Sequence, residues 1–140
     1  MGKLNRAKGY DLFAKAVLKI LNKYKDWNAI VIGDESRAVL DFKHKRLKNL
    51  GFLNHNKVLD IFEKTSIAVA CSRWEEPFGR TSLEASANGC AVIITNKGGL
   101  PETVTDAKII KNLNENNLTK AISELIKKKI LRKSLQERSI

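Results

Sequence analysis

The stretch "SIAVACSRWEEPFGRTSLEASANGCAVIITN", residues 66–96, decides the fold because it reads as strand, loop, helix and strand in succession. Two short apolar runs, 67–71 and 91–95, are each bounded by polar residues, as buried strands are. The segment between them contains a helical stretch around Glu84. A connection of this length returns the chain to the same end of a sheet, so we expect the two strands to run parallel.

The same alternation extends over the rest of the chain. Apolar spacing predicts helices over 11–24, from Asn54 or Asn56 to about residue 62, and over 118–130. Further strands are expected over 28–33, 46–51 and 107–111. Continuous apolar strands separated by helices indicate a parallel sheet covered on both faces. We therefore predict one α/β domain over 1–140, a doubly wound Rossmann-like parallel sheet with helices on both faces.

The N-terminal segment "MGKLNRAKG" reads as a loop, where a nucleotide-binding Rossmann domain would begin with a strand. That first strand is therefore expected to be missing from this chain or cut at its N-terminus. In such sheets, ligands bind beyond the carboxyl ends of the strands. Gly33, Gly51 and the segments 72–79 and 96–102 are predicted to lie at that edge.

Composition narrows the class of protein. No stretch approaches the roughly 20 apolar residues that span a bilayer, and the start of the chain is polar, so we expect a cytoplasmic protein. Cys71 and Cys90 show no metal-binding spacing and are predicted to be reduced, mostly buried thiols. His44 and His55 are expected to be solvated, and no metal site is evident.

The chain is strongly basic, with 26 Lys and Arg against 15 Asp and Glu and a formal charge of +11. Such a charge attracts nucleotides, nucleic acid or acidic membrane surfaces. The basic run "KKKILRK", 127–133, reads by default as a solvated helix face. A nucleic-acid-binding module is a rival class, but no aromatic residues alternate with the basic ones as a stacking platform would require.

Lys3 and Lys8 lie in a loop that leads into the first long helix, where Gly2 and Gly9 permit tight turns. Cations beside free helix amides form a phosphate site. The segment is not a Walker loop, and no G-x-G-x-x-G occurs in the chain.

Glu76 and Glu84 stand eight positions apart across a Pro-Phe-Gly turn. Locally, Thr81 and Glu84 have the spacing of a capping box, in which the carboxylate reaches back to a backbone amide. By the same local rules Glu76 is an exposed loop charge. Local rules therefore favour structural roles for both carboxylates.

The wider order of motifs resembles a known family. "SRWEEPFGRTSLEASANG" followed by a strand and "NKGGLPE" is similar to the nucleotide-sugar site of glycosyltransferase family 4, the group 1 transferases of GT-B fold, whose mark is Glu-x7-Glu. "GKLNRAKG" resembles that family's opening Gly-Arg-Leu-x(3)-Lys-Gly, and "LGFLNHNKVLDIFEKTSIAVACS" matches the stretch between. The chain departs from the commonest pattern at Lys3, which replaces an Arg and loses its bidentate fork, and at Cys71 and Ala91, where Pro is common.

The resemblance implies a role for each matching residue. Two carboxylates would act on the donor, with Glu84 binding the ribose hydroxyls and Glu76 reaching the transferred sugar as the catalytic residue. The remaining implied contacts are with the diphosphate (Lys3, Lys8, Phe78, Gly79, Arg80), with the nucleobase (Gly51, Phe52, Leu53) and along the lining of the site (Ser72, Gly98, Gly99). No cofactor and no metal ion are implied.

By the same resemblance the chain is the C-terminal, donor-binding half of a retaining glycosyltransferase. It would bind a nucleoside-diphosphate sugar for transfer of a hexose to a lipopolysaccharide core or other envelope glycan, and an acceptor-binding domain would precede it. The isolated chain is then expected to be inactive in transfer. Lysines and the arginine of 127–133 are expected to permit peripheral contact with an anionic membrane. The alternatives are a nucleic-acid-binding module and a nucleotide-sugar epimerase of the same architecture.

Overall fold

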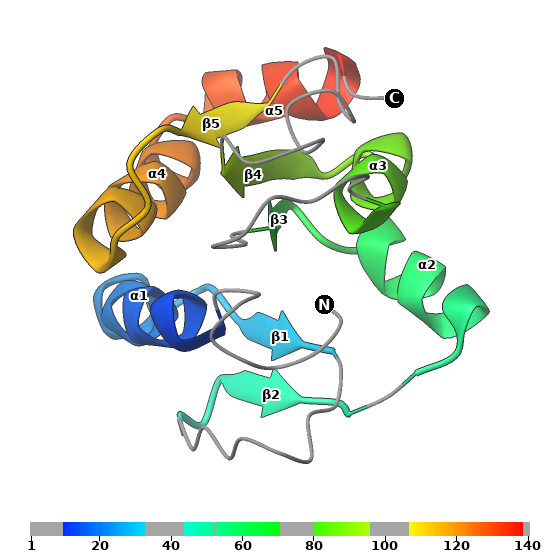
Figure 1. Cartoon of the computed structure of the whole chain (residues 1–140), viewed down its shortest axis with the longest axis horizontal. Coiled ribbons are helices and arrows are strands. Elements are labelled where there is room, and N and C mark those ends of the chain that lie inside the picture. The colour runs from blue at the N-terminus through cyan, green and yellow to red at the C-terminus, as the bar shows by residue number, and fades with distance from the viewer. Residues whose placement is uncertain (1–9, 33–43, 52, 71–79, 96–106, 139–140) are drawn as a thin grey trace.

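The structure, a computed structural model, describes residues 10–32, 44–51, 53–70, 80–95 and 107–138 (Figure 1). In chain order the helices and strands are α1 (Tyr10–Lys23), β1 (Ala29–Val31), β2 (Leu47–Asn49), α2 (His55–Glu63), β3 (Ile67–Ala70), α3 (Arg80–Ala87), β4 (Ala91–Thr95), β5 (Lys108–Ile110), α4 (Glu115–Lys127) and α5 (Lys129–Arg138). The described elements include each of the predicted strands, but two pairs of strands, β1 and β2 and then β4 and β5, follow one another with no described helix between them.

Every pair of strands in the described residues is parallel, which confirms the predicted parallel architecture. β1 pairs with β2, and β3, β4 and β5 form a second group in that order. Ile67 is opposite Ala91, and Ile93 is opposite Lys108. Within the described ranges, no ladder joins β1 to β3, so the pairing forms two groups of strands instead of one continuous sheet.

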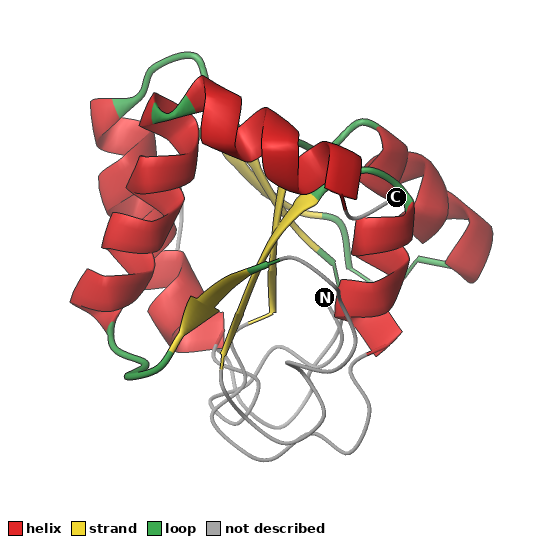
Figure 2. Cartoon of the chain, turned by 90° about the horizontal axis from the view of Figure 1, so that it is seen from above, coloured by secondary structure: helices red, strands yellow, loops and turns green. Residues whose placement is uncertain are grey.

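Helices cover both faces of these strands (Figure 2). The five residues of β4 are all buried, and the first four alternate between two hydrophobic cores. Ala91 and Ile93 pack with α1, α4 and α5, whereas Val92 and Ile94 pack with α2 and α3. Because neighbouring residues of a strand point to opposite faces, this division confirms the predicted double-sided cover.

The helices also connect the two groups of strands. Ala14 of α1 packs on Val31 of β1, while the next turns of the same helix enter the core against β4. From α5, the guanidinium of Arg132 lies over the ring of Trp27, 5.1 Å from its centroid, and the Nε2 of Gln136 donates to the carbonyl of Ser66 at 3.2 Å. One helical layer therefore spans both groups.

The C-terminal region differs from the prediction of one helix over 118–130. α4 ends at Lys127, Lys128 has a non-helical ψ of 78°, and α5 begins at Lys129. Arg132 donates to the carbonyls of Leu125 and Ile126, at 3.2 and 3.3 Å, so the next helix supplies partners to the last turn of α4. The interpretation of 127–133 as a solvated face holds for its exposed lysines but is wrong for Arg132.

Cys90 is a free, buried thiol, as predicted, while Cys71 lies outside the described residues. The Sγ of Cys90 donates to the carbonyl of Phe62 at 3.3 Å, and burial raises the pKa of this thiol to about 11. The thiol is therefore uncharged at neutral pH and acts in packing. Across the described ranges no three His, Cys, Asp or Glu side chains gather as metal ligands, and none of the helices is long and apolar enough to cross a membrane.

Candidate functional site

Because the strands are parallel, their carboxyl ends meet at one edge of the fold. The described part of that edge holds the turn after β2, the start of α2, and α3, which follows β3 in the chain (Figure 1). The predicted nucleobase segment and the predicted ribose carboxylate belong to these elements.

The turn after β2 is built around Gly51. Its N–H donates to Oδ1 of Asn49 at 2.9 Å, and its φ is +67°. A Cβ at this position would meet nothing within 4 Å, so the left-handed backbone, and not a lack of space, favours glycine here. The turn directs the chain from the carboxyl end of β2 to the N-terminus of α2.

Asn54 caps α2, since its Oδ1 accepts from the N–H of Lys57 at 3.0 Å. This confirms the predicted helix start and selects Asn54 over Asn56. Leu53, the last residue of the predicted nucleobase segment, is half-buried and packs against the core formed by α2, α3 and β4, which includes Ala85. The end of that segment is thereby fixed against the same core as the helix that carries Glu84.

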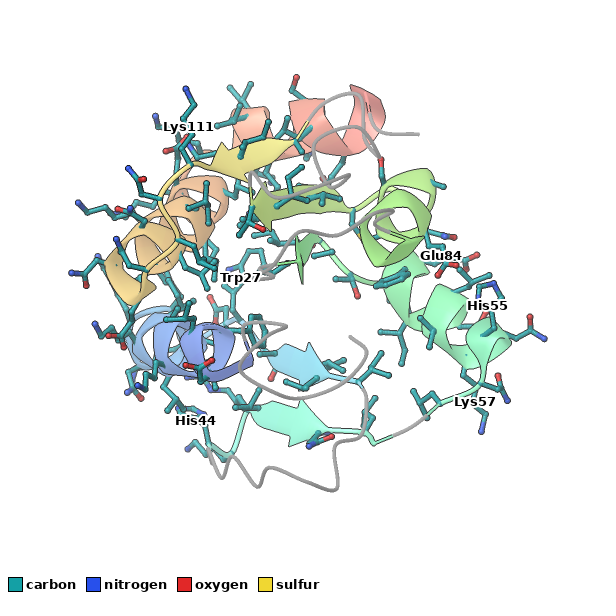
Figure 3. The ribbon with its side chains drawn as sticks, viewed as in Figure 1. Trp27, His44, His55, Lys57, Glu84 and Lys111 are labelled. Carbon is teal, nitrogen blue, oxygen red and sulfur yellow. The ribbon has the colours of Figure 1, made fainter. Side chains whose placement is uncertain are left out.

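The carboxylate of Glu84 reaches from α3 to the first residue of α2. Its Oε1 lies 3.9 Å from Nδ1 of His55, and its side chain is 24% exposed (Figure 3). α3 begins at Arg80, so Thr81 lies inside the helix and does not occupy the N-cap position. The capping-box interpretation of Thr81 and Glu84 is therefore wrong.

The prediction that His55 is solvated is confirmed, whereas His44 is only half-exposed, and both rings have partners that the sequence did not indicate. His55 is exposed but pairs with Glu84, and His44 bonds Oδ1 of Asn22 at 3.2 Å and accepts from the N–H of Arg46 at 3.1 Å. Sequence reasoning missed His55 because its partner lies on another helix. Its position two residues after the predicted nucleobase segment was the available signal.

The geometry leaves Glu84 able to bind a ligand. At 3.9 Å the imidazole is a neighbour of Oε1 that forms an ion pair with it only when protonated, and it is not a hydrogen-bond partner. A carboxylate accepts several hydrogen bonds, and the partial positive charge at the N-terminus of α2 favours an anion nearby. A pair of adjacent hydroxyl groups is a ligand that such a carboxylate can accept.

Of the remaining predicted site residues, the structure describes the backbone of one. Arg80 is the first residue of α3. The others lie outside the described residues: Lys3, Lys8, Phe52, Ser72, Glu76, Phe78, Gly79, Gly98 and Gly99.

Comparison with known proteins covers the whole chain. The family described as "Glycosyl transferases group 1" matches residues 1–140. The chain is 33% identical over 114 residues to the lipopolysaccharide core biosynthesis mannosyltransferase LpsB of Rhizobium meliloti, covering 74% of this chain and 32% of that protein. It is 28% identical over 121 residues to spore coat protein SA of Bacillus subtilis, covering 77% and 32%. The chain thus spans about a third of the length of these relatives.

Solved structures of glycosyl transferases also resemble this chain. The C-terminal domain of the glycosyl transferase group 1 family protein LpcC from Francisella tularensis superposes with a TM-score of 0.87 at 29% identity, over 99% of this chain and 79% of that one. Anabaena Alr3699/HepE, crystallised with UDP-glucose, gives a TM-score of 0.82 at 20% identity, over 99% and 42%, and shows the shared fold alone. Since the family match covers every residue, the chain belongs to the group 1 glycosyl transferases and has the fold of a GT-B C-terminal domain.

Proposed function

We propose that the chain is the donor-binding part of a retaining glycosyltransferase and holds a nucleoside-diphosphate sugar at the carboxyl edge of its strands. The observation that carries this proposal is the approach of Glu84 to His55, two residues beyond the segment 51–53. Two sequence motifs far apart in the chain, one proposed for the nucleobase and one for the ribose, are adjacent in the fold. A nucleoside requires that adjacency.

We propose one set of residues for each part of the ligand: the base, the ribose, the diphosphate and the transferred sugar. Glu84 accepts from the ribose hydroxyls, and the segment 51–53 contacts the base. The diphosphate is bound by Lys3, Lys8 and the backbone amides of 78–80, and Glu76 contacts the transferred sugar. Cations and helix amides stabilise the negative charge that develops on a leaving diphosphate.

The proposed sugar is a hexose, and the proposed acceptor is a lipopolysaccharide core or another envelope glycan. This finer proposal is supported by the description of LpsB as a lipopolysaccharide core biosynthesis mannosyltransferase. Because the match covers only about a third of each of these relatives, we propose that the acceptor-binding domain lies in their remaining length.

Titration calorimetry of residues 1–140 with UDP-glucose, GDP-mannose and ADP-glucose tests the proposal. We expect saturable binding of one of them and no sugar transfer by the chain alone. Absence of binding at millimolar ligand would contradict the proposal. Tight binding to DNA that weakens steeply with salt would favour the nucleic-acid-binding alternative, because counterion release dominates such complexes.

We also propose peripheral contact with an anionic membrane surface through the junction of α4 and α5. Ile130 is 87% exposed and lies among the exposed lysines of 127–129 and Lys133. An exposed apolar side chain surrounded by cations is typical of surfaces that bind acidic lipid headgroups.

Co-sedimentation with vesicles tests this contact. The chain is expected to bind vesicles that contain phosphatidylglycerol and not vesicles of phosphatidylcholine alone. Ile130→Ser and Lys129→Ala should each reduce binding severalfold, whereas Lys45→Ala, which removes the same charge from another surface, should not. Equal loss in Lys129→Ala and Lys45→Ala, with no loss in Ile130→Ser, would mean that net charge alone attracts the protein and would contradict the proposed contact.

A further inference from the structure

The imidazole of His55 lies at the candidate site, although none of the proposed ligand contacts involves it. His55 is the first residue of α2 and follows the segment 51–53, proposed for the nucleobase, by two positions. Its side chain is 64% exposed, and its Nδ1 lies 3.9 Å from Oε1 of Glu84, which is proposed for the ribose (Figure 3). The ring can therefore exchange a proton with solvent and still act on that carboxylate.

The helices that carry the two side chains are fixed against each other. Asn54 caps α2 immediately before His55, which sets the position of the first turn. Val58, one turn further along α2, and Ala85, the residue after Glu84 on α3, are buried in the same hydrophobic core. Because the backbone on both sides is held in this way, the imidazole and the carboxylate stay close, and their charges decide how strongly they interact.

The charges of the ligand give the imidazole a task. A nucleoside-diphosphate sugar carries its anionic diphosphate a few bonds away from the ribose. An ionised Glu84 that accepts from the ribose hydroxyls therefore repels the diphosphate of the same ligand. An imidazolium beside Oε1 offsets this repulsion, and as a charged donor it also restricts rotation of the carboxylate, so that less freedom is lost on binding. Histidine is the side chain that gains or loses such a charge between pH 5 and 8.

The other charged groups around α2 do not supply a charge that changes in this range. Lys57 lies two positions from His55, and residues at that spacing of a helix do not face each other. The remaining charged residues of α2 and its C-cap come later in the helix: Asp60, Glu63 and Lys64. The described side chains that pack against α2 from the strands are apolar, and the thiol of Cys90 in this core is uncharged. From α3, Glu84 faces the ring, and Arg80 keeps its charge at every pH in question.

We propose, on the basis of the proposed function, that His55 is a positioning residue of the donor site. Its protonated ring orients the carboxylate of Glu84 toward the ribose hydroxyls and offsets the repulsion between that carboxylate and the diphosphate. The nucleotide sugar then binds more tightly while His55 is protonated, and its affinity falls as rising pH removes the proton. Because linked equilibria are reciprocal, binding of the nucleotide sugar takes up part of a proton at the ring.

Titration calorimetry in an acidic buffer, about pH 5.5, and in a neutral one, about pH 7.5, tests this role. The ligand is whichever of UDP-glucose, GDP-mannose and ADP-glucose binds most tightly. A nucleotide sugar is used because its esterified diphosphate keeps its charge in this range, whereas a terminal phosphate titrates near pH 6. We expect a Kd about threefold lower in the acidic buffer. Buffers of different ionisation enthalpy should reveal uptake of about a quarter of a proton midway through the range.

Substitutions of the two histidines in the chain separate charge from structure. His55→Gln removes the charge and should bind in both buffers as the native chain does in the neutral one, without proton uptake. His55→Lys keeps a charge in both buffers and should bind in each as the native chain does in the acidic one. His44→Gln is the matched control, because His44 lies across the molecule from His55, and it should keep the native pH profile (Figure 3). Both His55 variants should unfold within about 3 °C of the native chain, since the side chain is mostly exposed.

Three outcomes would overturn the role of His55 and leave the proposed function intact. One is an equal Kd in both buffers for the native chain, and another is a native pH profile in His55→Gln. The third is tighter binding in the neutral buffer, which would mean that the imidazolium competes with the ribose for Glu84. Absence of saturable binding for all three nucleotide sugars would reject both the role of His55 and the proposed function, so the two failures are distinguishable.

Discussion

Glu84→Ala is expected to weaken the binding of UDP-glucose by about thirtyfold, which corresponds to roughly 2 kcal/mol for hydrogen bonds between a carboxylate and the ribose hydroxyls. Its carboxylate lies beside the N-terminus of α2, partly buried and not hydrogen-bonded to His55. Stability should change little, because the ion pair it forms is partly exposed and such pairs contribute less than about 1 kcal/mol. Calorimetric titration and thermal unfolding measure the two effects separately.

A ligand lacking one hydroxyl makes this test specific. The hydroxyl that is removed is the 2′-hydroxyl of the ribose. Binding of 2′-deoxy-UDP is therefore compared with binding of UDP, both for the native chain and for Glu84→Ala. Removal of the hydroxyl should cost affinity in the native chain and little in Glu84→Ala. Glu63→Gln, at the exposed end of α2, is the control that changes charge alone. If Glu84→Ala bound UDP as the native chain does, the ribose assignment would be rejected.

Local sequence signals were sufficient for most of the elements. The uninterrupted apolar run 91–95 predicts a strand buried on both faces, and all five residues are buried. The apolar spacing after Asp11 predicts α1, and the residues on that stripe, among them Val17 and Leu21, lie in the core. Asn54 was a predicted cap because its side chain bonds a backbone group three residues away. Each of these relations is contained within a few consecutive residues.

The errors concern contacts between elements. The apolar spacing of 118–130 continues through Lys128, but Arg132 bonds the last carbonyls of α4 and contacts Trp27, and a spacing pattern contains neither contact. The capping-box spacing is present at Glu84, yet its carboxylate lies by His55 of another helix. The role that the family resemblance gives Glu84, binding of the ribose, stays a prediction, because no contact between two protein side chains tests it.

The guanidinium of Arg46 makes hydrogen bonds that local rules do not predict, and these bonds hold the end of α1. Its Nη1 donates to the carbonyls of Tyr24, Lys25 and Trp27 at 3.1, 2.8 and 2.7 Å, and its Nη2 donates to the carbonyl of Leu21. The last carbonyls of a helix and of the turn after it lack partners within the helix, and they carry partial negative charge. One guanidinium therefore satisfies four acceptors between α1 and β1.

Arg46→Ala is expected to lower the free energy of unfolding by about 3 kcal/mol, or Tm by roughly 10 °C, because several half-buried carbonyls lose charged donors at once. Arg46→Lys should recover less than half of that loss, since an ammonium group cannot reach both the Leu21 and the Trp27 carbonyls with the planar fork of arginine. Lys45→Ala, next in sequence and exposed, is the matched control for charge and should leave Tm within about 2 °C of the native value. Urea and thermal unfolding followed by circular dichroism measure all three. Equal stability of Arg46→Ala and Lys45→Ala would mean that water replaces the guanidinium at these carbonyls without cost, and the end of α1 would then depend on packing alone.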